Sequence, residues 1–189
     1  MQRITKQKVF VAGGAVILFL IAGFAFFHDN RKNDIEIARS LETTILPFVQ
    51  ENKITFYFDE NWCKAVQYGS SSAVEVFGDA GAGTVPCLGN AGAFSEQDVA
   101  IFDTIRDKLN AVDGAKFRHI ETEYPLTYRP EHASLSHESI GLAFGTDCGF
   151  CRVRYVYWPE YQQLPPNIEG EITYTPIDRS WYRIDQDWN

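Results

Sequence analysis

Hydrophobic and polar positions divide the chain into two parts of different character. Residues Val9–Phe27 form an unbroken apolar run without a charged residue. A helix needs ~20 such residues to cross the hydrocarbon core of a bilayer. From His28 to Asn189 the pattern is mixed, as in a folded domain. We therefore expect a transmembrane anchor followed by one domain.

A cleaved signal peptide is the alternative interpretation of the apolar run. Its apolar region would be ~7–15 residues long, with small residues at the cleavage site. The run here is longer, and its small residues near the end, Gly23 and Ala25, flank a phenylalanine. We favour an uncleaved anchor that contacts membrane lipid through Val9–Phe27.

Flanking charges predict the orientation of the anchor. The preceding tail carries Arg3, Lys6 and Lys8 and no acid, whereas the other flank mixes bases with acids. Cytoplasmic flanks are enriched in Lys and Arg. We expect residues 1–8 in the cytoplasm and the C-terminal domain outside it, as in a single-pass signal-anchor protein of the cell membrane.

Helical periodicity returns directly after the anchor, over residues 28–52. The apolar positions of this segment fall on one helical face: Ala38, Leu41, Ile45 and Phe48. Because Pro47 disfavours helical geometry at the residue before it, the helix should end near Leu46. We interpret it as a juxtamembrane amphipathic helix, either continuous with the anchor or packed on the domain.

Residues 53–189 combine one further helix with alternating segments typical of strands. Ser95 is a suitable N-cap with acids after it, and Gly114 a suitable stop. The buried stripe expected between them comprises Val99, Phe102, Ile105, Leu109 and Val112. The expected strands are 54–58, 65–68, 73–77, 116–124, 139–146, 151–158, 171–175 and 181–185. Short connections favour antiparallel neighbours, so we predict an α+β fold with two helices after the anchor and a sheet of about five to seven strands.

Net charge excludes one class of partner. The formal charge is −8, of which the N-terminal tail contributes three positive charges, leaving −11 for the rest. An acidic surface of this size repels phosphate backbones. Nucleic acid is therefore not expected as a partner.

The four cysteines, Cys63, Cys87, Cys148 and Cys151, indicate two disulfides in an oxidising compartment, with three possible pairings. We favour Cys63–Cys87, which would close the Gly-rich loop, and Cys148–Cys151.

The Cys148-Gly149-Phe150-Cys151 motif has two alternative interpretations. A thiol oxidoreductase would place a helix after it, but the residues that follow favour a strand. Gly149 instead suits a two-residue hairpin loop, whose flanking residues lie within disulfide range. A metal half-site is the other alternative, with His119, His132 and His137 as partners. We interpret these histidines as solvated loop residues and expect neither a metal nor a cofactor.

Two surfaces could bind a ligand. Glu121 and Glu123 share one strand face, as do Arg152 and Arg154, so neighbouring strands would make a charged patch. A solvated sheet face is the simpler interpretation.

Aromatic residues are concentrated late in the chain: Tyr155, Tyr157, Trp158, Tyr161, Tyr174, Trp181, Tyr182 and Trp188. We attribute them mainly to the core. No Gly-x-Ser-x-Gly hydrolase motif is present. We therefore expect a protein-interaction or ligand-binding envelope domain without a catalytic residue. The alternative is a membrane-tethered oxidoreductase using Cys148 and Cys151.

Overall fold

The computed structural model describes residues 33–77, 87–89, 91–122, 141–147, 151–159 and 161–187. The predicted anchor, Val9–Phe27, and the tail 1–8 lie outside these ranges. Within them, no helix combines the length and apolar character needed to cross a bilayer.

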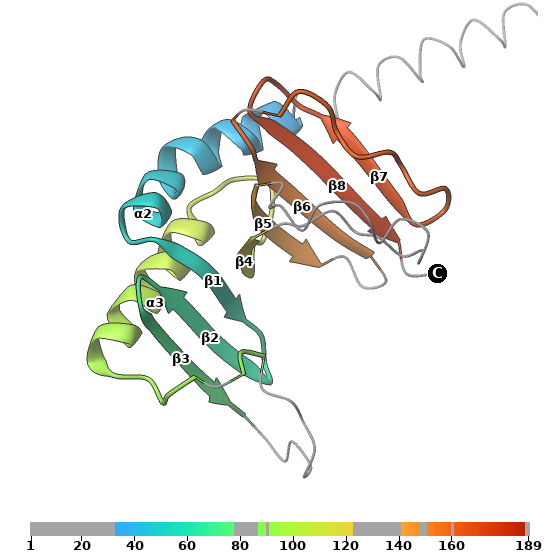
Figure 1. The fold of residues 1–189 in the computed structure, drawn as a ribbon. Coiled ribbons are helices and arrows are strands. Elements are labelled where there is room, and N and C mark those ends of the chain that lie inside the picture. The colour runs from blue at the N-terminus through green and yellow to red at the C-terminus, as the bar shows by residue number, and fades with distance from the viewer. Residues whose placement is uncertain are drawn as a thin grey trace, which may run out of the picture.

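One antiparallel sheet of eight strands forms the domain, in the order β3-β2-β1-β4-β5-β6-β8-β7 (Figure 1). The strands are β1 (Ile54–Asp59), β2 (Cys63–Tyr68), β3 (Ser71–Val76), β4 (His119–Thr122), β5 (Leu142–Asp147), β6 (Cys151–Tyr157), β7 (Ile172–Pro176) and β8 (Trp181–Asp187). The expectation of α+β is confirmed. The sheet exceeds the predicted five to seven strands because β1 pairs with both β2 and β4, which joins the first three strands to the later five.

The segment 33–51 contains the break that the sequence predicted near Leu46, but the chain becomes helical again directly after it. Residues 33–44 are helical, Ile45 forms a turn, and α2 (Leu46–Glu51) begins at once. Pro47 lies in the first turn of α2, where its missing N–H removes no helical hydrogen bond. The proline therefore separates two helices.

The helix α3 (Glu96–Asn110) begins with a capping box between Ser95 and Asp98. The Asp98 N–H donates to Ser95 Oγ over 3.2 Å, and the Ser95 N–H donates to Asp98 Oδ2 over 2.9 Å. Burial alone would raise the pKa of Asp98, but hydrogen bonds from Ser95 and Tyr68 outweigh it and lower that pKa. Asp98 thus takes a buried position, and its neighbour Val99 is 45% exposed. The prediction that Val99 is buried is wrong.

The helices cover one face of the sheet (Figure 1). The resulting core unites all three helices with alternate residues of the strands. Its largest fully buried side chains include Trp181, Tyr57, Phe144, Leu41 and Ile105. The predicted stripe residues Phe102, Leu109 and Val112 also belong to it.

A polar contact docks the first helix on the far end of the sheet. The Tyr155 hydroxyl donates to Asp34 Oδ1 over 2.7 Å, and Arg183 Nη1 lies 3.1 Å from the same oxygen. Burial, and then the bond to Asp34, raise the pKa of Tyr155. The segment that follows the predicted anchor is therefore an integral part of the domain, within the residues described.

A second, smaller core lies on the opposite face of the sheet. It joins Ala143, Val156, Ile172, Tyr174, Tyr182 and Ile184, and Trp158, Tyr161, Leu164 and Ile168 pack against it. The late aromatic residues named in the sequence thus divide between two cores, and their assignment to core packing is confirmed for Tyr155, Trp181, Tyr182 and Tyr174. Trp188 lies outside the described residues.

Candidate functional site

An open cleft of about 730 Å³ lies where β1 leads into β2. One wall is α3, through Arg106 and Asn110, and another is the segment that leads from α3 to β4. The lining residues are Asp59, Glu60, Asn61, Lys64, Phe77, Arg106, Asn110, Ala115, Lys116, Phe117 and Arg118. Small-molecule sites in proteins usually span ~300–1,000 Å³. The cleft therefore has the size of a ligand site.

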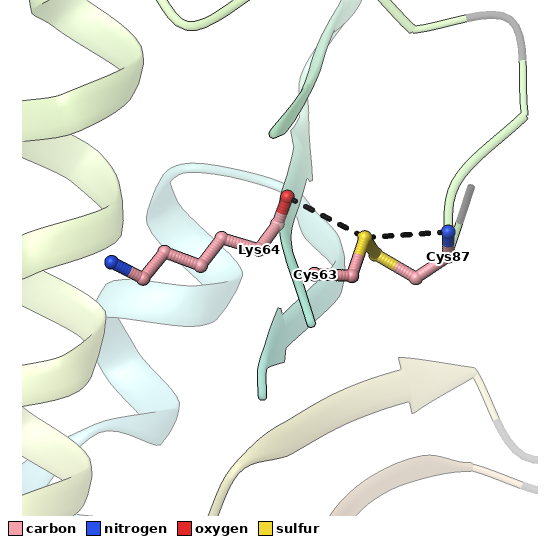
Figure 2. Close-up of a disulfide and its surroundings, with 3 residues drawn as sticks. All are labelled: Cys63, Lys64 and Cys87. Atoms are coloured by element: carbon pink, nitrogen blue, oxygen red, sulfur yellow. Dashed lines mark hydrogen bonds between the residues drawn. A yellow bond between two sulfur atoms is a disulfide. The ribbon is translucent and has the colours of Figure 1, made fainter. Parts of the chain in front are cut away.

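Lys64 is the best-placed cation of the cleft. It projects from β2 toward α3, away from Cys63 (Figure 2). Its Nζ lies 5.0 Å from the ring centre of Phe77 and 5.9 Å from that of Phe102. Such cation–π contacts favour a positive charge, and an ammonium has three N–H donors. Among the described residues no ion pair involves Lys64.

Two arginines of the cleft form exposed ion pairs. Arg118 Nη1 lies 3.2 Å from Glu60 Oε2, and the Arg118 side chain is 45% exposed. Arg106 Nη2 lies 2.7 Å from Asp103 Oδ1, with exposed fractions of 38% and 47%. Exposed pairs contribute only ~0–1 kcal/mol. Both guanidinium groups can therefore exchange these partners for another anion at little cost.

A buried tyrosine donates to the acid at the end of β1. The Tyr57 hydroxyl donates to Asp59 Oδ2 over 3.3 Å. Burial raises the pKa of Tyr57, and the charge of Asp59 raises it further. Tyr57 consequently stays protonated. This hydrogen bond holds the Asp59 carboxylate on the cleft lining.

Glu60 connects the cleft to the uncovered face of the sheet. While Oε2 accepts from Arg118, Oε1 lies 3.4 Å from Nε2 of His119. The His119 ring is buried and stacks on Phe58 at 4.6 Å. The prediction that His119 is a solvated loop residue is wrong, because the residue falls inside β4, whose described part pairs with strands on both sides.

The charged patch on β4 and β6, which the sequence left as the alternative to a solvated sheet face, is present in part. Glu121 Oε1 lies 3.9 Å from Arg152 Nη1 and 3.8 Å from Arg154 Nη1. Arg154 is 5% exposed and also donates to Gln186 Oε1 over 3.3 Å. The interpretation as a solvated face is therefore wrong for Arg154, and the sequence did not indicate Gln186. Glu123 lies outside the described residues.

Gly145 makes room for this polar centre. On one row across the sheet, His119 pairs with Gly145, and Gly145 pairs with Arg154. A Cβ atom on Gly145 would lie 3.3 Å from Cβ of His119 and 3.7 Å from Cγ of Arg154. Glycine thus allows the two large side chains to approach each other over β5.

The sequence did not reveal the cleft, because its lining comes from four separate segments. Lys116 and Arg118 offered the only local signal, since residues two apart in an extended segment face the same side. Lys64 and Arg106 had no distinguishing neighbours. Their proximity arises because α3 packs along β1 and β2, with Asp98 bonded to Tyr68 near one end of β2 and Arg106 lining the cleft with Lys64 near the other.

The predicted disulfide between Cys63 and Cys87 is present, with Cα atoms 6.2 Å apart (Figure 2). Cys151 is also disulfide-bonded. Its predicted partner Cys148 lies outside the described residues, so that pairing stays a prediction. Cys151 is the first residue of β6, as the residues after it indicated.

Metal ligands do not gather in the described ranges, where no group of three His, Cys, Asp or Glu side chains could hold an ion. The candidates His132 and His137 lie outside these ranges. Comparison of the chain with protein-family models, curated proteins and solved structures gives no match.

Proposed function

We propose that this chain is a single-pass membrane protein whose α+β domain, held outside the cytosol by Val9–Phe27, binds a ligand or an envelope protein. The cleft beside α3 carries this proposal. It combines the volume of a ligand site with the half-buried cation Lys64, which has aromatic contacts but no ion pair among the described residues. A site of this kind recognises a partner without needing a nucleophile or an acid–base pair.

The cysteines support an extracytoplasmic location. Cys63 is fully buried and bonded to Cys87 across 24 positions. Disulfides persist in oxidising compartments and are rare in the cytosol. The base-rich tail before the anchor favours the same orientation.

The domain would stand close to the membrane surface. Five residues, 28–32, separate the end of the predicted anchor from the helix that packs into the core. An extended residue spans at most ~3.6 Å, so the separation is at most about 20 Å. A domain tethered this closely suits a partner in the same membrane or at its surface.

A thiol oxidoreductase using Cys148 and Cys151 is the weaker candidate. A reactive cysteine gains from a helix N-terminus, whose partial positive charge lowers the thiol pKa. Cys151 instead opens β6, a strand paired with β5 and β8. We therefore attribute a structural role to this cysteine pair.

Topology and cysteine mapping test the proposal together. A reporter that is active only in the cytosol, fused after Asn189, should be silent, whereas a reporter that needs export should be active. Peptide mapping without reduction should find Cys63 linked to Cys87 and Cys148 linked to Cys151. A strong cytosolic signal, or four free thiols in freshly isolated protein, would contradict the proposal.

A further inference from the structure

We propose that the cleft between α3 and the β1–β2 turn binds a small organic anion carrying two or more phosphate or carboxylate charges. This inference deepens the binding role proposed above by naming the class of ligand. It stands on the charge, the volume and the donor groups of the cleft, and it does not depend on which side of the membrane the domain occupies.

The charge of the cleft opposes that of the whole protein. Four of the 17 Lys and Arg residues line it, namely Lys64, Arg106, Lys116 and Arg118, against two of the 25 Asp and Glu residues. Its formal charge is therefore +2, within a chain of net charge −8. A concave site lined mainly by one sign of charge concentrates ions of the other sign.

The cationic side chains of the cleft can bind an anion without breaking a buried ion pair among the described residues. Lys64 makes cation–π contacts and no ion pair in the described ranges, and Lys116 is an exposed lysine with none there either. Arg106 and Arg118 hold only exposed pairs. A guanidinium binds carboxylate or phosphate through two parallel N–H bonds, and the side-chain amides of Asn61 and Asn110 add neutral donors at the rim.

The ligand is expected to be small. Removing the cleft charge of +2 from the net charge of −8 leaves −10 for the rest of the chain. A nucleic acid would extend beyond the cleft onto this repelling surface. A small anion, by contrast, fits within the 730 Å³ of the cleft and meets only its cationic lining.

The cleft also provides apolar contact beneath the cations. Phe77 lies half-buried under Lys64, and Phe117, which is 4% exposed, lines the opposite wall. A ligand with a short carbon skeleton between its charged groups would pack on the exposed part of the Phe77 ring while its charges reach the lysines and arginines. This favours an organic anion over a bare inorganic ion.

Titration calorimetry on the full-length protein in a neutral detergent tests the proposal. Pyrophosphate and citrate serve as probes for phosphate and carboxylate charges, in low salt at neutral pH. Saturable binding of either anion is expected, and it should weaken as NaCl is added. Binding of only one probe would assign the ligand to that chemistry, whereas binding of neither at millimolar concentration would overturn the proposal.

Paired variants locate the site. The variant Lys64→Gln/Lys116→Gln should bind the anion at least about tenfold more weakly, because each lysine contributes a charge-assisted hydrogen bond. The control variant Arg39→Gln/Arg179→Gln removes the same charge from exposed positions outside the cleft and should bind within about twofold of the unaltered protein. Equal affinities of the two variants would overturn the proposal.

A second variant guards against a folding defect from Lys64, which is partly buried. Arg106→Gln/Lys116→Gln changes only the outer lining of the cleft and should weaken binding by a similar factor. Circular dichroism checks that each variant is folded. Loss of anion binding with an intact extracytoplasmic reporter signal would reject the ligand class alone, whereas a reversed topology with retained binding would reject only the location.

Discussion

The two faces of the sheet differ in the kind of side chain that they bury. The helix-covered face buries one continuous apolar core that includes residues of all three helices. The uncovered face carries a smaller core on β5, β6, β7 and β8, and its centre holds His119, Arg154 and Glu121. The same strands supply both faces, since side chains alternate along a strand. The covered face thus provides most of the apolar burial, while charged groups lie near the centre of the uncovered face and in the cleft beside α3 on the covered face.

A substitution at Trp181 tests whether the core on the covered face contributes most to the stability of the domain. It is fully buried and contacts the rings of Phe144 and Tyr157. Trp181→Ala should lower the free energy of unfolding by ~3–5 kcal/mol, because the cavity adds to the lost burial. Urea unfolding in detergent, followed by circular dichroism, measures it. Thr173→Ala on the exposed side of β7 should change it by less than ~0.5 kcal/mol; similar losses from both would break the comparison.

The disulfide tests how far the uncovered face depends on covalent support. Replacing both partners, as Cys63→Ser/Cys87→Ser, should lower the free energy of unfolding by ~2–4 kcal/mol, since the bond restricts the unfolded chain. Reduction of the unaltered protein should cost at least as much, because it also breaks the disulfide of Cys151. Chemical unfolding with and without reductant measures both losses, and a double variant as stable as the oxidised protein would show that this loop needs no such support.

Gly145 tests the packing of the polar centre. Gly145→Val should destabilise the fold by ~1–3 kcal/mol, because the added side chain would press on His119 and Arg154. Gly89→Val serves as a control, since no atom lies within 4 Å of a Cβ placed there. The midpoints of thermal unfolding compare the two variants. An equal effect would mean that the centre of the uncovered face is loosely packed.

Removing the capping box of α3 should have the smallest effect on the free energy of unfolding, and this effect should depend on pH. Asp98→Ala should cost about 1 kcal/mol at neutral pH. The pKa of Asp98 is lowered in the folded protein, so its contribution is complete above the unfolded pKa, ~4, and is lost as the pH falls through the folded value. Unfolding of both proteins at pH 7 and pH 3 should show a smaller difference in acid. A difference that grows in acid would contradict the hydrogen bonds assigned to Asp98.

Local patterns predicted the elements better than the site. Alternation in β1, β2 and β3 and the N-cap at Ser95 sufficed to locate those elements. The prediction that Val99 is buried was wrong because apolar character at helical spacing does not say whether a first-turn residue reaches the core. The prediction that His119 is solvated was wrong for a related reason. Its ring stacks on Phe58, which lies in a strand some sixty positions earlier, and no local pattern reveals a contact between such distant residues.

What the sequence determined by itself is what depends on neighbours along the chain: the apolar run Val9–Phe27, the alternation of the strands, the N-cap of α3 at Ser95 and the excess of acid. Tertiary structure alone decided what depends on distant neighbours. It aligned His119, Gly145 and Arg154 on one row, and it brought Lys64 beneath α3 beside Arg106 and Lys116. The physical reason is that hydrogen bonding and side-chain periodicity act over a few residues, whereas burial and charge depend on everything that surrounds a side chain in space.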